Sequence, residues 1–148
     1  MANKMKEKKR LSGMTKKERD CLVAIRESTV APFPARLCEV ARIMGISSPS
    51  ALEIIGRLKG KNLAESRNGM ITLTEEGDAE YERIVLNHRV LESLFVQSGI
   101  SMEKACRDIK AFDYFLDTRT SLAILRKIGN PASCPHGDPI RVGTEGGQ

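Results

Sequence analysis

The chain has 148 residues, a formal net charge of +5 and 41% hydrophobic residues. This length allows one compact domain or two small lobes, and two lobes fit the sequence pattern better. We expect no membrane segment, because no stretch approaches the roughly 20 apolar residues that a transmembrane helix needs. Four widely spaced cysteines and an N-terminus without an apolar signal segment predict a reducing, cytoplasmic location rather than secretion.

The charge is divided unevenly along the chain. Residues 1–73 hold 15 Lys and Arg against 7 Asp and Glu, a net charge of +8, whereas residues 74–148 hold 9 against 12, a net charge of −3. A basic half suits the neutralisation of phosphates, and an acidic half rich in carboxylates suits the binding of cations. Part of the positive charge lies in residues 1–13, which we interpret as a basic, disordered tail.

Residues 14–60 predict three helices in sequence. Thr15-Lys-Lys-Glu18 matches the capping box S/T-x-x-E and predicts a helix through about Ser28. Two prolines in residues 30–35 predict a connection. Helical spacing of apolar residues predicts a second helix over residues 36–45, ended by Gly45. After a three-residue break, Ser48 is the expected N-cap of the third helix.

Residues 63–73 predict a short two-stranded hairpin. Its turn contains Asn68-Gly69, and this pair tolerates the positive φ angles that a tight hairpin turn requires. Helix, turn, helix and hairpin together indicate a winged helix-turn-helix that reads double-stranded DNA. The DNA-binding residues predicted from this arrangement are Ser47, Ser48, Pro49, Ser50, Glu53, Arg57, Lys61 and Arg67. A surface of serines binds phosphate well but encodes little base sequence.

Residues 75–140 predict a second, helical lobe. Thr74 caps a long helix that ends near Gly99, Ser101 caps a further helix to about Leu116, and Asp117 or Thr118 caps the last one. The expected fold is therefore mainly α, with a winged helix over residues 14–74, a helical lobe over 75–140 and a flexible tail over 141–148.

His88 and Glu92 are the first candidates for metal ligands. They are four residues apart on the predicted long helix, so both side chains project on one side and can converge on one ion. A half-buried histidine with a purely structural role is the more common outcome of such a pattern.

The chain resembles the diphtheria toxin repressor family of iron- and manganese-dependent transcriptional regulators. The residues that carry the resemblance are the winged helix, Leu73-Thr-Glu-Glu-Gly77, Asn87-His-Arg-Val-Leu-Glu92, Gly129-Asn-Pro131 and Cys134-Pro-His-Gly-Asp-Pro-Ile140. The resemblance implies a homodimer whose helical lobe mediates dimerisation and binds Fe²⁺ or Mn²⁺. The chain is too short to include the SH3-like domain that some members add.

The resemblance also implies a set of metal ligands. Asp20, His88 and Glu92 lie at ligand positions of the family, whereas Lys110 and Tyr114 stand where members carry ligands that this chain lacks. Asp113 can still ligate through oxygen, and Cys106 falls where some members place a histidine. The predicted metal ligands are therefore Asp20, His88, Glu92, Cys106 and Asp113. A thiolate favours Zn²⁺ or Fe²⁺ over Mn²⁺.

Three alternatives stay open at this point. A metal-independent repressor would use the ammonium of Lys110, paired with Glu92 or Asp113, in place of the cation. Cys134 and His136 form another candidate metal site, for which packing against the lobe is the competing interpretation. An enzyme is not expected, because the nucleophile and oriented base of a catalytic site are not found.

Overall fold

The computed structural model describes residues 13–143, so all but the last residue of the predicted tail at residues 1–13 lies outside the described part, as do residues 144–148. The chain divides into two compact units, one comprising residues 13–82 and the other residues 83–143 of the described chain. None of the described helices is long and apolar enough to cross a membrane.

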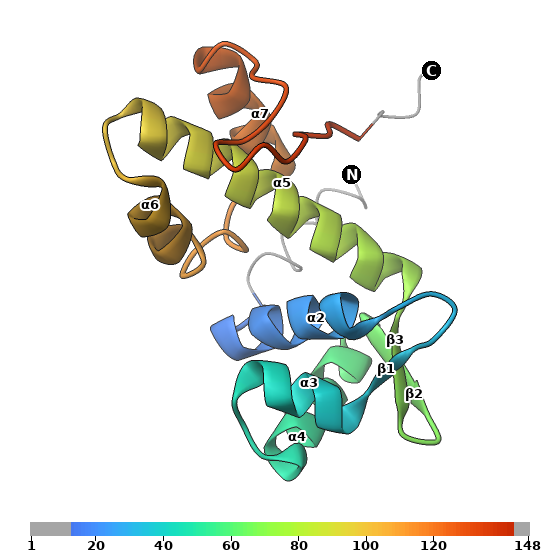
Figure 1. Cartoon of the computed structure of the whole chain (residues 1–148). Coiled ribbons are helices and arrows are strands. Elements are labelled where there is room, and N and C mark those ends of the chain that lie inside the picture. The colour runs from blue at the N-terminus through green and yellow to red at the C-terminus, as the bar shows by residue number, and fades with distance from the viewer. Residues whose placement is uncertain (1–12, 144–148) are drawn as a thin grey trace, which may run out of the picture. The chain divides into compact units, whose positions relative to one another are not determined.

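The first unit is a winged helix (Figure 1). Its elements are α2 (Lys16–Ser28), β1 (Ala35–Arg36), α3 (Leu37–Met44), α4 (Ser48–Gly60), β2 (Ala64–Arg67), β3 (Met70–Leu73) and the start of α5 (Glu75–Gln97). The core contains Leu22 and Ile25 of α2, Val40 of α3, and Ile55 and Leu58 of α4, all fully buried. The mainly α winged-helix fold predicted from the sequence is confirmed.

Local signals place most of these elements correctly. Thr15 and Glu18 form the predicted capping box of α2, and Gly45 ends α3 in the left-handed conformation at φ 66°. Asn68 and Gly69 have φ angles of 53° and 74° in the hairpin turn. The two strands of the wing pair in the register Ala64 to Leu73, as successive antiparallel neighbours.

Two details of the first unit differ from the sequence prediction. The N-cap of α4 is Ser47 rather than Ser48, because the side-chain oxygen of Ser47 accepts a hydrogen bond from the Ser50 amide. The sheet also has three strands in the order β1-β3-β2. Ala35 and Arg36, predicted to lie in a connection and at a helix start, pair with Ile71 and Met70 instead.

Gly77 explains why the start of α5 carries a glycine. Thr74 caps this helix by accepting a hydrogen bond from the Gly77 amide at 3.0 Å, and its own hydroxyl donates to the Asn62 carbonyl. A Cβ atom at position 77 would lie 1.9 Å from the Leu63 carbonyl oxygen, so only glycine permits this close approach.

The second unit is built around α5, with α6 (Met102–Ile109) and α7 (Thr118–Lys127) packed against it. Leu86 and Val90 of α5 form one apolar cluster with Leu125 of α7 and with Ile140. Leu91 of α5 forms another with Ala105 and Ile109 of α6. Two faces of α5 are thus buried, as expected for a long helix at the centre of a helical lobe.

The prediction that α6 continues to Leu116 is wrong. The helix ends at Ile109, and residues 110–116 form turns. Asn87 donates to the carbonyls of Asp113 and Leu116, and Arg83 donates to those of Tyr114 and Leu116. These hydrogen bonds from α5 hold the turn that follows α6, in which Asp113 is completely buried.

Candidate functional site

The N-terminus of α4 presents the predicted serines to solvent. Ser47, Ser48, Pro49 and Ser50 are all exposed. The Ser47 hydroxyl donates to the Ser50 hydroxyl at 2.8 Å and accepts from the Ser50 amide at 3.3 Å. The start of this helix therefore offers hydroxyls and the positive end of the helix dipole, a combination that suits phosphate.

The two cations predicted at the other end of α4 are paired inside the unit. Lys61 Nζ lies 2.5 Å from Oε2 of Glu18, a carboxylate whose side chain is only 3% exposed, and it also contacts the Gly13 carbonyl. Arg57 lies 3.9 Å from the other Glu18 oxygen and 3.6 Å from Glu53. Both cations therefore balance carboxylates of the same unit, and Lys61 in particular stabilises a buried charge.

The wing carries a further predicted DNA-binding cation, Arg67, which is exposed to solvent. Arg67 is exposed at the end of β2, directly before the turn. Its neighbour Ser66 accepts a hydrogen bond from Lys59 Nζ at 2.9 Å, which ties the wing to α4. Arg67 thus keeps its predicted position for contact with a DNA backbone or groove, and contact with DNA stays a prediction.

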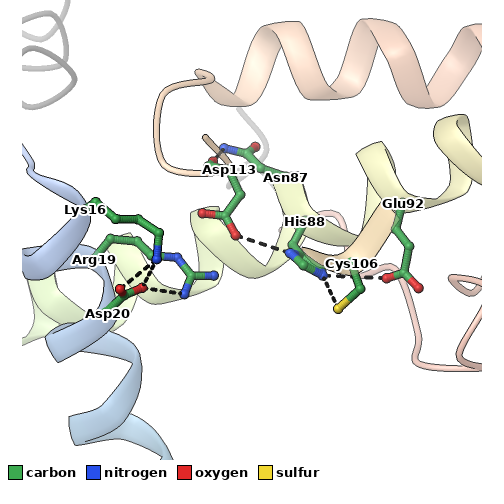
Figure 2. A network of polar contacts seen from close by, with 8 residues as sticks. All are labelled: Lys16, Arg19, Asp20, Asn87, His88, Glu92, Cys106 and Asp113. Atoms are coloured by element: carbon green, nitrogen blue, oxygen red, sulfur yellow. Dashed lines mark hydrogen bonds and ion pairs between the residues drawn. The ribbon is translucent and has the colours of Figure 1, made fainter. Parts of the chain in front are cut away.

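His88 is the centre of the first group of predicted metal ligands (Figure 2). Its Nε2 lies 3.5 Å from Cys106 Sγ and 3.7 Å from Glu92 Oε2, while its Nδ1 lies 3.2 Å from Asp113 Oδ2. A tetrahedral Zn²⁺ ion, with bonds of ~2.05 Å to N or O and ~2.3 Å to S, separates its ligand atoms by roughly 3.3–3.6 Å. The contacts of Nε2 are close to this spacing, and Asp113 approaches the opposite ring nitrogen.

A second group of ligand atoms shares Glu92. Glu92, Cys134 and His136 place one carboxylate oxygen, one sulfur and one ring nitrogen within 4.8 Å of one another. Within residues 13–143 these three form the single set of His, Cys, Asp and Glu side chains that is compact in this way. His88, Glu92 and Cys106 do not form such a set, although the structure brings both other residues to His88.

The carboxylate of Glu92 has one oxygen without a hydrogen bond, and this oxygen belongs to the second group. Glu92 is 1% exposed, and its Oε1 is the one buried side-chain oxygen or nitrogen of the described residues without a hydrogen bond. His136 Nδ1 lies directly beside this oxygen, at ion-pair distance but outside hydrogen-bonding geometry. These two atoms form an ion pair. Two ligand atoms of one cation lie roughly 3.3 Å apart, so an ion bound by both would have to replace this direct contact.

The loop over residues 132–140 holds Cys134 and His136 in place. The Cys134 amide donates to the Asp138 carbonyl and the Gly137 amide donates to the Cys134 carbonyl, each at 2.8 Å. Arg89 of α5 donates to the Pro139 carbonyl at 2.6 Å. The sequence offers Cys134 and His136 only as an alternative, because nothing local indicates that Glu92 lies beside them.

Asp20 belongs to the other unit and has cationic partners there. Its Oδ1 lies 2.5 Å from Lys16 Nζ and 3.1 Å from an Arg19 nitrogen (Figure 2). Its predicted role as a metal ligand stays a prediction, and it would require an ion to displace these two side chains. The neighbouring Cys21 is not a candidate ligand, because burial and two nearby carboxylates raise the pKa of its thiol to about 12.

Lys110 and Tyr114 stand where the family resemblance would place metal ligands, and the structure shows the surroundings of both side chains. Lys110 is the C-cap of α6 and is exposed, and no hydrogen bond or ion pair involving its ammonium is found within residues 13–143. Tyr114 is buried, with its ring stacked on Phe115 at a centroid distance of 4.6 Å. Neither side chain is arranged as a metal ligand.

Comparison with known proteins identifies the second half of the chain. Residues 74–141 match the family described as "Iron dependent repressor, metal binding and dimerisation domain". This part of the chain is similar to the metal-binding and dimerisation domain of iron-dependent repressors. An uncharacterized HTH-type transcriptional regulator of Aeropyrum pernix is 27% identical over 108 residues, which are 72% of this chain and 59% of that protein. The chain thus spans 59% of the length of this relative.

Solved structures share the fold of this chain. A hypothetical protein from Sulfolobus solfataricus has a TM-score of 0.76 at 26% identity, over 87% of this chain and 100% of that chain. A manganese-dependent transcriptional repressor in complex with manganese has a TM-score of 0.71 at 25% identity, over 86% of this chain and 59% of that chain. The predicted family resemblance is confirmed.

Proposed function

We propose that this chain is a DNA-binding transcriptional repressor, active as a homodimer, whose affinity for its operator is controlled by a divalent transition metal bound through Glu92, Cys134 and His136. The observation that carries the proposal is the buried Oε1 of Glu92, which has no hydrogen bond and lies beside His136 in a compact set of three donors. A cation at this point would balance the buried carboxylate and use all three donors.

The donor set favours Zn²⁺ or Fe²⁺ over Mn²⁺. One nitrogen, one sulfur and one oxygen are ligands that zinc and ferrous iron accept readily, whereas Mn²⁺ prefers oxygen. A solved relative, ScaR, has been crystallised with bound Zn²⁺ and with bound Cd²⁺, at 20% identity to this chain. When bound, the ion would neutralise the carboxylate and require Cys134 as thiolate.

The remaining predicted ligands of this unit then orient Glu92. If Nδ1 of His88 donates to Asp113, Nε2 is left with a lone pair that accepts from the Cys106 thiol. His88 is satisfied on both sides without an ion, in contrast to Glu92 Oε1. We therefore assign His88 and Asp113 to the support of the ligand helix α5, a role that such neighbours commonly have at metal sites.

Metal binding can affect the conformation of the DNA-binding unit through α5, the helix that carries Glu92. α5 is one continuous helix from Glu75 to Gln97, so it begins in the winged helix and continues through the second unit. An ion that binds one arrangement of this helix and its loop more tightly than another shifts the population toward that arrangement. In a dimer, two α4 helices would contact half-sites about one DNA turn, ~34 Å, apart.

The metal-independent repressor has less support. That alternative requires the Lys110 ammonium to replace the cation beside Glu92 or Asp113, but Lys110 is exposed and has no ion pair within the described residues. It predicts that Lys110→Ala weakens DNA binding and that chelation has no effect.

The proposal is tested by DNA binding of the full chain with and without metal. The probe is a duplex selected from a random library, titrated in chelator and then in Zn²⁺, Fe²⁺ or Mn²⁺. We expect at least a tenfold gain in affinity with the activating metal, which corresponds to about 1.4 kcal/mol of coupling. Equal affinity in chelator and in all three metals would refute metal control, and failure to bind any duplex would refute the DNA-binding function itself.

A further inference from the structure

The exposed side of α4 carries a large aliphatic side chain that the fold does not use. Leu52 is 56% exposed, whereas Ala51, Ile54, Ile55 and Leu58 of the same helix are buried. Pro49 precedes Leu52 by three residues and Gly56 follows it by four, so these three residues are neighbours on the helix surface. A Cβ atom at Gly56 would have no other atom within 4 Å, which leaves open space next to Leu52.

The cations of α4 are poorly placed to read bases. The most common specific contact of a recognition helix is an Arg or Lys side chain on guanine. Here Arg57 and Lys61 pair with Glu18, and Lys59 donates to Ser66. Each of these three cations thus contacts a partner within the winged helix.

Adenine also has no matching side chain on this helix. Adenine is typically read by Asn or Gln, and residues 48–60 contain neither. The exposed side of α4 offers serine hydroxyls at its start, the aliphatic Leu52 and the carboxylate of Glu53. An aliphatic side chain matches the 5-methyl group of thymine, and a carboxylate can accept from the amino group of cytosine.

We propose that Leu52 determines operator specificity by packing on the 5-methyl group of a thymine in the major groove. This inference rests on the proposed DNA-binding function and adds to it the class of base that is read. Leu52 would bury aliphatic surface that water otherwise contacts, next to the open position at Gly56. The contact would select thymine over cytosine, because cytosine lacks the methyl group.

The test removes the thymine methyl group from the DNA and, separately, the Leu52 side chain from the protein. Duplexes are first selected from a random library with the metal-loaded full chain, and thymines in the best duplex are then replaced one at a time by deoxyuridine. We expect the wild-type chain to lose about three- to tenfold in affinity at one such position in each half-site, the effect of burying roughly one methyl group. Leu52→Ala should bind the thymine and uracil duplexes equally.

Val30→Ala is the matched control, since Val30 is an aliphatic residue of the same unit, 68% exposed and outside α4. This variant should keep the full preference for thymine.

Equal binding of thymine and uracil duplexes by the wild-type chain, or an unchanged preference in Leu52→Ala, would overturn the role of Leu52 while leaving the proposed repressor intact. A Leu52→Ala change in oligomeric state with unchanged base preference would instead assign this side chain to a contact between copies. Absence of duplex binding by the wild-type chain would refute the proposed function.

Discussion

Glu92 and His136 form an ion pair in the second unit: the buried Oε1 of Glu92, which has no hydrogen bond, lies directly beside Nδ1 of His136. Because Glu92 is in α5 and His136 is in the loop after α7, this contact joins the central helix to a segment distant in sequence. A buried charge in such a position costs free energy unless a cation compensates it. Metal binding should therefore be visible as a gain in stability.

Glu92→Gln should remove this gain. At free Zn²⁺ about 100 times the dissociation constant, binding stabilises the folded wild-type chain by about 2.7 kcal/mol, or roughly 5–10 °C in Tm for a chain of this size. Without metal, Glu92→Gln should be as stable as the wild-type chain or more stable, because the buried charge is gone. Thermal unfolding with Zn²⁺ and with chelator measures both effects. An unaltered Zn²⁺ shift in the variant would exclude Glu92 as a ligand.

Lys61→Gln should affect stability more than it affects DNA binding. The substitution leaves the buried Glu18 carboxylate with Arg57 at 3.9 Å as its remaining cation. Lys61 is 35% exposed, so we discount the cost of a fully buried pair and expect about 1–2 kcal/mol by urea unfolding.

Arg67→Gln is the control for Lys61→Gln. Arg67 is exposed on the wing, and its loss should leave stability nearly unchanged but reduce the slope of log affinity against log salt by about one. Lys61→Gln should leave that slope within about 0.3 of the wild-type value, on the same counterion-release argument. The opposite pattern would place Lys61 on phosphate and Arg67 away from it.

Gly77→Ala should destabilise the winged helix, whereas Gly56→Ala should not. A Cβ at position 77 would meet the Leu63 carbonyl oxygen at 1.9 Å, so the segment before β2 and the start of α5 must separate, at a cost of about 2–3 kcal/mol. Gly56 lies inside α4 with open space around it, and alanine there should stabilise by about 0.5–1 kcal/mol. Urea unfolding of the two variants compares them directly, and similar costs for both would contradict the close approach at Gly77.

Asp117 should make the stability of the second unit depend on acid pH. Its side chain accepts from the Thr120 amide at 2.7 Å at the start of α7, and these hydrogen bonds lower the pKa of the carboxyl below its ordinary value of 3.8. A folded-state pKa below the unfolded one stabilises the fold above about pH 3.8, and this contribution is lost as pH falls through the folded-state pKa.

Asp117→Ala should therefore cost about 1 kcal/mol at neutral pH, and the difference from the wild-type chain should shrink in acid. Asp117→Asn retains a capping side chain without a titrating group, so its cap should not weaken over the same range. Urea unfolding as a function of pH tests the pair. A cost for Asp117→Ala that is constant down to pH values below about 3 would contradict a carboxylate cap.

The sequence predicts those features of the fold that depend on neighbouring residues. Thr15 and Glu18 are three residues apart, Asn68 and Gly69 are adjacent, and Gly45 directly follows its helix, so each signal and its effect lie within one turn of chain. The spacing of His88 and Glu92 likewise places both on one side of α5. The family motifs added the candidate ligands that spacing alone does not single out.

Features that depend on distant residues were missed for a common physical reason. The turn that replaces the predicted end of α6 is held by Arg83 and Asn87, whose hydrogen bonds to its carbonyl groups span 26 to 33 residues. The pairing of Lys61 with Glu18, 43 residues earlier, likewise has no local signal. The role of Cys134 and His136 depends in the same way on Glu92, since their loop alone supplies only two donors.

The most direct test of the central claim is Co²⁺ titration of the metal-free full chain and of two matched variants, Cys134→Ser and Cys106→Ser. Both substitutions replace one thiol by a hydroxyl near Glu92 or His88. If Glu92, Cys134 and His136 hold the ion, the wild-type chain and Cys106→Ser should show a thiolate-to-cobalt charge-transfer band, and Cys134→Ser should lack it. Loss of the band in Cys106→Ser with retention in Cys134→Ser, or no band in the wild-type chain, would contradict the account.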